Sequence, residues 1–441
     1  MNSPSASSIP SAGVSRRSVL KVGAGVASLA LLPGALISAC SSSKSGGGGS
    51  ASGGSASGTT SIGSNYSDAN VKSAFAAVIA GYSKASQVSA NTVDHNSFQN
   101  NIQNYLQGTP NDVFCWFAGY RARFFAAQNL LSPIDDVWNT IGAKFSDSIK
   151  AASKGDDGHL YLVPWVNYPW VMFYKKSVFA AKGYTVPGTW DELIALCKQM
   201  QKDGFNTPIA IGQKDGWPAM GTFDYLDMRL NGYQFHMDLC AHKESWDQKK
   251  VKDVFDNWKA LLPFQDPNAL GATWQEAAQT LGQSKSGMYL LGSFVTQQFT
   301  DATVLADIDF FPFPAMATEG MDAVEAPIDG IMLSSKGAGN AGAMDLMKFL
   351  GTATAEDTYY SIDSSNLPVV KGADLSKLTP LNKKCADTIA GSKYISQFFD
   401  RDALPAMAST VMIPALQAFV KDGTVDTANL EAQAKSLYAS Q

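Results

Sequence analysis

Short apolar runs that alternate with amphipathic stretches, from residue 61 onward, are the feature that most constrains the fold of this chain. Residues 113–117 (Val-Phe-Cys-Trp-Phe) predict a buried strand, whereas residues 68–83 carry apolar side chains at close to a 3.6-residue period and predict a helix. Strands and helices alternate in this way when helices cover a parallel sheet. Because the chain has 441 residues, of which 45% are hydrophobic, it is long enough for two such α/β domains rather than one.

The first forty residues have a different character and predict an export signal. The pair Arg16-Arg17 precedes an apolar run from Val22 to Ala39, which is the layout of a secretory leader and resembles a twin-arginine signal. The run ends in Ile-Ser-Ala-Cys40, which resembles a bacterial lipobox. We therefore expect residues 1–39 to be a signal peptide and Cys40 to be lipidated. An uncleaved transmembrane helix is the alternative, although the run contains Pro33 and is shorter than the roughly twenty residues that a span needs.

Residues 40–60 are expected to be the lipidated cysteine and a tether. Nearly every residue from 41 to 60 is Ser, Gly, Ala or Thr, and this composition cannot bury a core. Such a coil has a mean reach of roughly 25 Å, from about 5 to 6 Å times the square root of the residue number. The folded body is therefore expected to lie close to the outer face of the membrane.

Charge and cysteine content narrow the possible partners. The net charge of −5 becomes −8 once the leader, which has three basic residues and no acidic one, is removed. This acidic balance argues against a nucleic-acid partner. The remaining cysteines lie singly, with no C-x-x-C pair, so we expect buried free thiols rather than disulfides; they are Cys115, Cys197, Cys240 and Cys385. Four histidines are scattered along the chain, so no metal site is predicted.

Five segments, in this order, resemble the family 1 extracellular solute-binding proteins, which serve carbohydrate ABC importers. The most specific are Tyr-x-x-Pro at residues 161–164 and Pro-Gly-Thr-Trp-Asp-Glu-Leu at residues 187–193. The full set comprises residues 110–113 (Pro-Asn-Asp-Val), 158–164 with 172–176, 187–193, 282–288 and 366–368 (Asn-Leu-Pro). Together these segments span most of residues 60–370.

The resemblance implies an α/β fold of two Rossmann-like lobes, of the type II periplasmic-binding-protein kind, with a cleft that closes on the ligand. By analogy, the chain crosses between the lobes near residues 166–172, 327–331 and 366–371. The expected lobes are therefore discontinuous. The N-terminal lobe comprises residues 61–168 and 329–368, and the C-terminal lobe comprises residues 169–328 and 369–441.

The resemblance also implies a function outside the cytoplasm. It predicts a solute-binding lipoprotein that captures a mono- or oligosaccharide in the cleft and delivers it to the permease of an ABC importer. Such a protein needs no cofactor and catalyses no reaction. We expect a monomer, held to the outer face of the cell membrane through Cys40 and exported by the twin-arginine route.

Residues at the first predicted crossing suit a sugar ligand. A sugar presents hydroxyls in its plane and C–H groups on its faces, so its site needs placed polar groups beside apolar, aromatic surfaces. Residues 165–170 (Trp-Val-Asn-Tyr-Pro-Trp) offer both kinds, with Trp165 and Tyr168 as stacking rings and Asn167 as a bridge between hydroxyls. Core packing is the alternative for these aromatic residues, because Trp and Tyr dominate buried area in any case.

Polar side chains also follow the first two predicted strands. Asn65 and Tyr66 follow the strand near Ile62, and Asp94 and His95 follow the strand at residues 88–93. In open α/β sheets, ligands collect at the carboxyl ends of strands. Helix capping is the alternative for these residues, since Asn and Asp are favoured caps without any ligand. With no second ligand near it in sequence, His95 is expected to be a neutral hydrogen-bonding side chain.

The remaining candidates lie farther along the chain. Arg121, close to two aromatic residues, is suited to clamping adjacent hydroxyls, and Phe294 is carried over by the resemblance. Trp217, on a turn, is a second stacking candidate, and Asp329 lies at the second crossing, where a hinge role is the alternative. Arg401 is expected to belong to a local ion-pair network. The complete set of candidate ligand-binding residues is Asn65, Tyr66, Asp94, His95, Trp116, Tyr120, Arg121, Trp165, Asn167, Tyr168, Trp217, Phe294 and Asp329.

Three other classes of function compete with sugar transport. A glycoside hydrolase would need two carboxylates flanking the scissile bond, but the acids within the matching segments fall on helix caps and surfaces, and neither G-x-S-x-G nor H-E-x-x-H occurs. The same fold binding a polyamine, a peptide or chelated iron is a closer alternative, because Asp94, Asp215 and Asp329 suit a cation. A surface lipoprotein without a transport role is the third.

Overall fold

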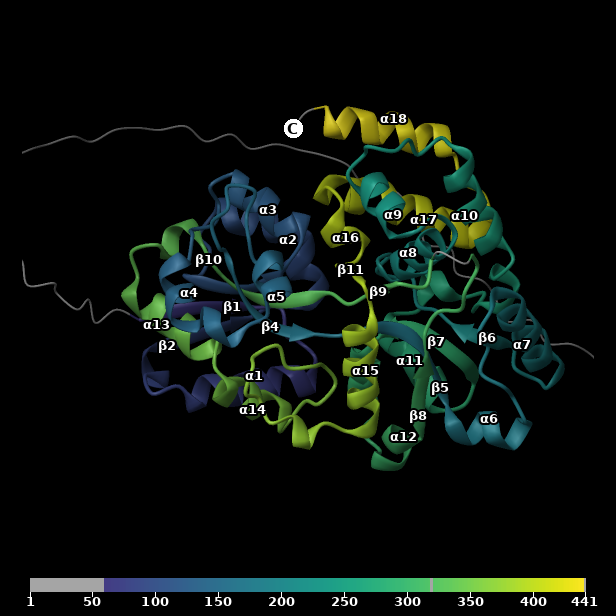
Figure 1. Ribbon diagram of the computed structural model, residues 1–441, viewed down its shortest axis with the longest axis horizontal. Helices are drawn as coiled ribbons and strands as arrows, with labels where there is room; N and C mark the ends of the chain where they lie inside the picture. Colours follow the sequence, from purple (N-terminus) through teal and green to yellow (C-terminus); the bar gives the residue numbers. More distant parts are fainter. Residues whose placement is uncertain (1–58, 318–319, 440–441) are drawn as a thin grey trace, which may run out of the picture. The chain divides into compact units, whose positions relative to one another are not determined.

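The computed structural model describes residues 59–317 and 320–439, and Figure 1 traces them from purple to yellow. The predicted signal peptide, the lipidation site Cys40 and nearly all of the Ser/Gly tether lie outside the described residues. Among the helices within the described ranges, none combines the length and the hydropathy that crossing a membrane requires.

The first sheet has five strands in the order β2-β1-β3-β10-β4. The strands are β1 (Thr60–Ser64), β2 (Val88–Thr92), β3 (Val113–Phe117), β4 (Leu162–Asn167) and β10 (Ile328–Leu333). Strand β1 pairs in parallel with β2 and β3, whereas β10 runs antiparallel to β3 and β4. Every residue of β3, β4 and β10 is buried. Burial on both faces is why these strands are rich in apolar residues on both faces rather than strictly alternating.

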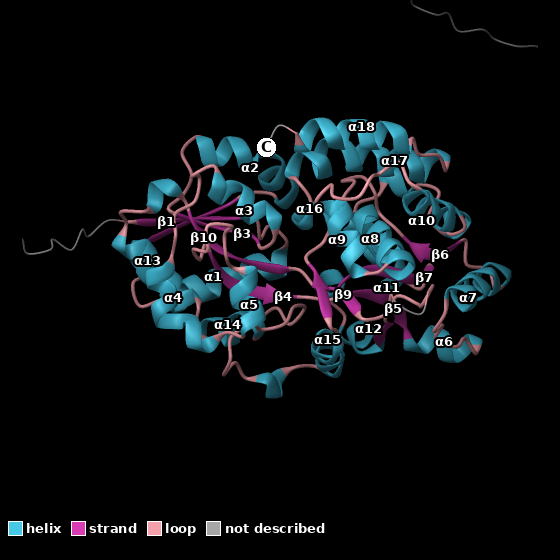
Figure 2. Cartoon of the chain, turned by 45° about the horizontal axis from the view of Figure 1, so that its top comes forward, coloured by secondary structure: helices cyan, strands magenta, loops and turns pink. Residues whose placement is uncertain are grey.

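The second sheet has the strand order β6-β7-β5-β8. These strands are β5 (Trp170–Lys175), β6 (Thr207–Ala210), β7 (Ser286–Gly292) and β8 (Ile308–Phe311). Strands β6 and β7 are parallel, and β5 is antiparallel to β7 and β8. A separate parallel pair joins β9 (Ala323–Glu325) to β11 (Tyr394–Ser396). Figure 2 shows the strands of both main sheets in magenta among the covering helices.

Helices cover both sheets. Near the first sheet, α13 contacts β1 and β4, and α3 contacts β3; near the second, α7 and α11 contact β6, α8 contacts β7 and α15 contacts β8. The helices are α1 (Ala69–Gly81), α2 (His95–Gln107), α3 (Tyr120–Ala127), α4 (Asp135–Ile141), α5 (Asp147–Ala152), α6 (Lys176–Lys182), α7 (Trp190–Lys202), α8 (Pro218–Asn231), α9 (Tyr233–Cys240), α10 (Lys249–Lys259), α11 (Trp274–Gly282), α12 (Ala302–Asp307), α13 (Ala341–Leu350), α14 (Ala353–Tyr360), α15 (Pro380–Gly391), α16 (Phe399–Asp402), α17 (Ile413–Asp422) and α18 (Thr427–Tyr438).

Local sequence signals fix several of these elements. Thr189 and Glu192 form a capping box at the start of α7, and Thr273 and Glu276 form another at the start of α11, so each helix begins where its backbone N–H groups are satisfied. The predicted strands at residues 113–117 and 88–93 are found as β3 and β2, and the predicted helix at residues 68–83 is α1. These predictions and the α/β class are confirmed.

The chain passes from the first sheet to the second between β4 and β5, at Tyr168 and Pro169. It returns to the first sheet between β9 and β10, through Ala326 and Pro327. After α14, Leu367 forms a bridge to Asn167 at the end of β4 before the chain continues to α15. Segments far apart in the sequence therefore meet beside the first crossing.

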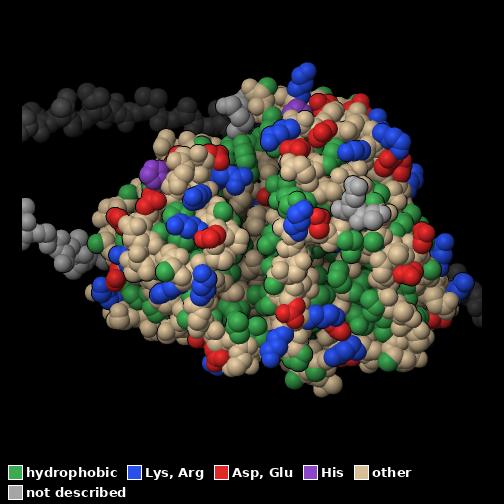
Figure 3. Space-filling model, in the orientation of Figure 1, with side chains coloured by type: hydrophobic (Ala, Val, Ile, Leu, Met, Phe, Trp, Pro, Cys, Tyr) green, Lys and Arg blue, Asp and Glu red, His purple; other side chains and the backbone are tan. Residues whose placement is uncertain are grey.

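Cys115, Cys197, Cys240 and Cys385 are buried and free. On the face drawn in Figure 3, basic and acidic side chains are interspersed rather than gathered by sign.

Candidate ligand-binding site

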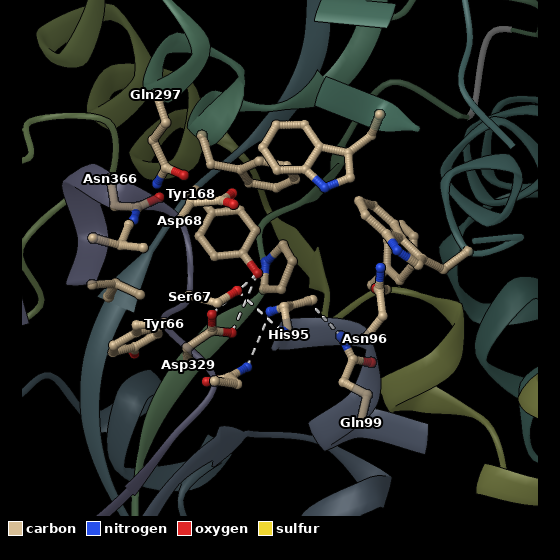
Figure 4. Close-up of a pocket in the computed structure, with 18 of the residues that line it drawn as sticks. Tyr66, Ser67, Asp68, His95, Asn96, Gln99, Tyr168, Gln297, Asp329 and Asn366 are labelled. Atoms are coloured by element: carbon tan, nitrogen blue, oxygen red, sulfur yellow. Dashed lines mark hydrogen bonds between the residues drawn. The ribbon is translucent and has the colours of Figure 1, made fainter. Parts of the chain in front are cut away.

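A pocket with a volume of about 130 Å³ lies between residues that follow strands of the first sheet and residues attached to the second. We call its two sides the polar wall and the aromatic wall. The polar wall consists of Asn65, Asp68, Asp94, His95, Asn96, Gln99 and Asp329. The aromatic wall consists of Trp170, Trp217, Trp274, Phe294 and Phe398. Figure 4 shows the labelled polar residues around Tyr168.

The polar wall is built at the carboxyl ends of two parallel strands. Ser64 in β1 is in register with Thr92 in β2, so the residues that follow these strands come together. Asp94 caps α2 by accepting a hydrogen bond from the N–H of Ser97 at 2.9 Å, and this contact lowers the pKa of Asp94. Asp94 therefore caps a helix, as the alternative interpretation predicted, and it also lines the pocket.

His95 joins two amides of the polar wall. Arg121 donates to Oε1 of Gln99 at 3.1 Å, and because an arginine can only donate, the Nε2 group of Gln99 is left to donate to Nε2 of His95, 2.6 Å away. Burial and the charge of Arg401 lower the pKa of His95 to about 4, so the ring is neutral at pH 7 and its proton lies on Nδ1. The side-chain amide of Asn65 lies 3.2 Å from Nδ1 of His95, and with its oxygen turned towards the ring it would accept this proton.

An ion-paired cluster joins the pocket's two sides. Arg401 donates to Oδ1 of Asp329 at 2.5 Å and to the hydroxyl of Tyr168 at 2.8 Å. The guanidinium also lies 3.9 Å from the ring centroid of Phe117. Burial raises the pKa of Asp329, and Arg401 opposes that effect. The pairing register of β10 with β4 shifts between Asp329 and Gly330, and such a bulge re-aims a side chain.

A second buried ion pair lies beside the first. Arg121 donates to Oδ2 of Asp400 at 3.1 Å, and the side chains are 9% and 13% exposed. Arg121 follows β3 of the first sheet, whereas Asp400 and Arg401 lie on α16, which packs against α8. Each pair therefore joins one residue attached to the first sheet to one on α16. The prediction that Arg401 belongs to an ion-pair network is confirmed, and Arg401 also lines the pocket.

The aromatic wall is a set of rings in mutual contact. The Trp170 and Phe398 centroids are 4.7 Å apart, and Phe294 lies 5.1 Å from Trp274 and 6.3 Å from Trp217. Offset and edge-to-face contacts of this kind stabilise aromatic clusters. The rings come from β5, the start of α8, the start of α11, the segment after β7 and the segment after β11.

The structure brings eight of the predicted residues to the pocket: Asn65, Tyr66, Asp94, His95, Tyr168, Trp217, Phe294 and Asp329. Five others do not line it: Trp116, Tyr120, Arg121, Trp165 and Asn167. In β4 the side chains alternate between faces, so Val166 faces the pocket while Trp165 packs against Phe75 and Tyr359. Asn167 is buried, and its Nδ2 donates to the carbonyl of Ala326 at 3.5 Å.

The other three candidates have roles behind the pocket. Trp116 is fully buried and packs against Phe98 and Phe117. Tyr120 packs on Phe124. The guanidinium carbon of Arg121 lies 4.8 Å from the ring centroid of Trp116, and Arg121 also forms an ion pair with Asp400. Arg121 therefore supports residues that line the pocket.

Sequence reasoning did not select several residues that line the pocket, among them Trp170, Trp274, Gln297, Asn366, Phe398, Asp400 and Arg401. Three of them carried a usable signal. Trp170 lies in the first predicted crossing, Asn366 belongs to one of the five matching segments, and Trp274 directly follows the cap residue Thr273. Gln297, Phe398, Asp400 and Arg401 lie far in sequence from the predicted crossings.

Two α/β sheets with a pocket between them, lined by polar groups and aromatic rings, define a two-lobed α/β fold with a site between its lobes. Residues 67–357 match the bacterial extracellular solute-binding protein family. The chain therefore belongs to that family, and the predicted family and type II fold class are confirmed.

The relatives are solute-binding receptors. The bacterial solute receptor AcbH, which has an exclusive substrate preference for β-D-galactopyranose, is 46% identical with a TM-score of 0.83, over 87% of this chain and all of that one. A chitin oligosaccharide binding protein, 20% identical with a TM-score of 0.75, covers 86% of this chain and 98% of its own. An ABC transporter extracellular-binding protein of Pyrococcus horikoshii is 25% identical over 72% of this chain and 69% of its own length. The multiple sugar-binding protein of Streptococcus mutans is 26% identical over 50% of this chain and 54% of its own length.

Proposed function

We propose that this protein is the sugar receptor of an ABC importer, and that it captures one neutral pyranose in the pocket and delivers it to a membrane permease. The two lobes that would close on the sugar comprise residues 61–168 with 329–368, and residues 169–328 with 369–441. The observation that carries the proposal is a set of buried polar atoms without hydrogen-bond partners in the pocket wall.

These atoms belong to residues that line the pocket. Buried polar groups in folded proteins are nearly always paired, so several unpaired ones around a cavity favour a ligand that supplies their partners. Within the described residues, Tyr66 Oη, Trp217 Nε1 and Asn366 Oδ1 belong to residues that line the pocket and have no hydrogen-bond partner. Donors and acceptors are mixed, which suits hydroxyl groups, because each hydroxyl both donates and accepts.

Size and charge favour a single uncharged ring. One water needs about 10–15 Å³ of such a cavity, so 130 Å³ holds roughly ten water-sized groups, close to one pyranose with its hydroxyls. Asp329 pairs with Arg401 and Asp400 pairs with Arg121, so two of the four carboxylates that line the pocket already face a cation, which disfavours a polyamine. The substrate preference of AcbH supports β-D-galactopyranose as the first ligand to test.

The test is isothermal titration calorimetry on residues 41–441 with β-D-galactopyranose, other hexoses, disaccharides and spermidine. We expect one hexose to bind and to be recovered unchanged, since the proposed receptor catalyses no reaction. At a hundred times its dissociation constant, the ligand should stabilise the fold by about 2.7 kcal/mol. Binding of spermidine and of no sugar would overturn the carbohydrate assignment.

The membrane anchor is part of the proposal. We infer that Cys40 is lipidated after export through the twin-arginine route, which holds the receptor as a monomer at the outer face of the cell membrane. In the native host, Cys40→Ser should move the protein from the membrane fraction to the soluble fraction. Substituting lysine for both Arg16 and Arg17 should stop its export. Retention of the Cys40→Ser protein in the membrane fraction would contradict the anchor.

A further inference from the structure

The segment from Ser396 to Asp402 contributes Phe398, Asp400 and Arg401 to the pocket. Phe398 has a φ of 91°, a backbone conformation that residues other than glycine seldom adopt. Such a conformation persists only where the surrounding structure holds it, and it occurs most often at functional sites. Something behind the pocket must therefore hold this segment.

Two buried carboxylates hold the backbone on either side of Phe398. Asp402 accepts hydrogen bonds from the N–H of Gln397 at 2.7 Å and from the hydroxyl of Ser396 at 3.1 Å. Asp224, on α8, accepts from the N–H of Phe399 at 2.8 Å. The N–H of Phe398 itself donates to the Ser396 hydroxyl oxygen at 3.3 Å. All three backbone donors in this turn are therefore held by side-chain oxygens, two of which belong to aspartates.

One face of α8 carries the contacts that reach the aromatic wall. Residues 217, 221, 224 and 225 are spaced by four, three and one, so they lie on the same side of the helix. Trp217 lines the pocket, and the hydroxyl of Tyr225 donates to the carbonyl oxygen of Trp170. Gly221 lets the rings approach, since a Cβ there would lie 2.5 Å from the Trp170 ring and 3.3 Å from Phe398.

Asp224 is itself held by a buried charged group. Nε2 of His236 lies 3.7 Å from Asp224, and its Nδ1 lies 3.0 Å from Asp227. Glu325 adjoins Asp224, and burial together with the charge of Asp224 raises the pKa of Glu325 well above its usual range. Asp224, Asp227, His236 and Glu325 are all fully buried. The raised pKa of Glu325 favours a neutral carboxyl beside Asp224, and Asp224 accepts from the N–H of Phe399.

We propose that Asp224 and Tyr225 are positioning residues for sugar binding: from behind the pocket they hold Phe398, Arg401 and Trp170 in the places where these residues meet the ligand. This inference rests on the proposed function, since it assigns how the sugar site keeps its shape. Neither side chain touches the pocket, so their effect on affinity passes through the residues they hold.

The same helix offers a matched control. Asp227 is as buried as Asp224, contacts the same His236 and lies less than one turn farther along α8. Its other hydrogen-bond partner is Nδ2 of Asn231, at 2.8 Å, which lies outside the pocket segment. A purely structural role for buried acids on α8 would make Asp224 and Asp227 equivalent.

The experiment measures sugar affinity, thermal stability and the near-ultraviolet circular dichroism of residues 41–441 for Asp224→Ala, Asp224→Asn, Asp227→Ala and Tyr225→Phe. We expect Asp224→Ala to weaken the sugar affinity at least tenfold and to change the aromatic spectrum. Asp224→Asn should recover most of the affinity, because its amide oxygen still accepts from the N–H of Phe399. Asp227→Ala should lower stability and weaken the affinity clearly less than Asp224→Ala does, because it reaches the turn only through His236.

The outcomes separate this inference from the proposed function. If the unaltered protein binds no sugar, the proposed function fails. If it binds sugar and Asp224→Ala binds equally well, or if Asp227→Ala weakens binding as much, the positioning role is overturned. Should Asp224→Ala not fold, Tyr225→Phe decides, since it removes one hydroxyl: a weakening of threefold or more with an altered aromatic spectrum supports the inference, and an unchanged affinity overturns it.

Discussion

The two walls of the pocket are built in different ways. The polar wall comes mainly from short segments that directly follow β1 and β2, two neighbouring parallel strands of one sheet. The aromatic wall comes from five separate segments between residues 170 and 398, which meet only when the second sheet and its helices have folded. The position of the polar wall follows from short sequence segments next to two strands. The position of the aromatic wall depends on packing contacts between residues that are far apart in the sequence. The two should therefore respond differently to mutation.

The largest expected effect comes from removing the residue that joins the walls. Arg401→Ala leaves Asp329 as a buried carboxylate without its cation, and breaking such a pair costs about 3–5 kcal/mol. We expect the sugar affinity to fall by about a hundredfold or more, at about 1.4 kcal/mol for each tenfold step, and the melting temperature to fall as well. Calorimetry and a thermal melt measure both.

Arg123→Ala is the control for that experiment. Arg123 pairs with Asp156 at 3.2 Å on the surface, where the aspartate side chain is 71% exposed. Exposed pairs contribute little, so affinity and stability should both stay close to those of the unaltered protein. If Arg401→Ala kept its affinity within threefold, the ion pair would not be part of the sugar site.

The next effect tests the aromatic wall alone. Trp217→Ala removes a ring that contacts Phe294 and Trp170, and we expect a loss of about 2 kcal/mol in binding, or roughly thirtyfold in affinity. Trp217→Phe keeps a smaller aromatic face and loses the Nε1 donor, so the loss in affinity should be smaller than for Trp217→Ala. Trp190→Ala, on α7 and away from the pocket, should leave affinity unchanged. Equal losses for Trp217→Ala and Trp190→Ala would mean that general destabilisation, not stacking, is being measured.

A smaller effect, on stability, should come from the polar wall through pH. The pKa of His95 is lowered to about 4 in the folded protein, against about 6.5 in the unfolded chain. Between these values the unfolded chain binds a proton that the folded protein does not, so stability is lost as pH falls from 6.5 towards 4. Because His95 is partly exposed to the pocket, we expect no more than about 2 kcal/mol from this residue.

Urea unfolding at pH 7 and at pH 4.5 checks this expectation. His95→Gln cannot take up the proton, so the difference in unfolding free energy between the two pH values should shrink. His159→Gln, which alters an exposed histidine paired with Asp135, is the control. An equal pH difference in the unaltered protein and in His95→Gln would contradict the assignment of a neutral His95.

The comparison also explains how much of the site the sequence could predict. Asn65 and His95 were found from one local rule, that ligands meet the carboxyl ends of parallel strands, and the structure places both in the pocket. Phe398 and Arg401 had no such signal, because their approach to Tyr168 depends on the pairing of β11 with β9 and on the carboxylates that hold the turn. Sequence patterns record neither contact.

The direction in which side chains point from a strand was the other feature that the sequence could not predict. The segment at residues 165–170 was placed correctly at the crossing between the sheets, but its period of two leaves two choices of face. The structure turns Trp165 and Asn167 into the first sheet's core and leaves Val166 and Tyr168 at the pocket. Choosing between the faces requires knowing which side of β4 the helices cover, and that is a property of the whole lobe.

The smallest expected change in affinity therefore comes from Trp165, and a matched pair of substitutions tests it. Trp165 and Trp170 are both at most 2% exposed and lie five residues apart, yet only Trp170 lines the pocket. Trp165→Phe shrinks a ring that packs edge-on against Phe75 and Tyr359, so it should lower the free energy of unfolding by about 1–2 kcal/mol and change the affinity by no more than about twofold. Trp170→Phe should weaken binding about fivefold, since it alters a ring that meets both the ligand space and Phe398. If Trp165→Phe weakened binding as much as Trp170→Phe, the side chain of Trp165 would have to face the pocket rather than the core of the first sheet. The aromatic wall would then extend into the first sheet.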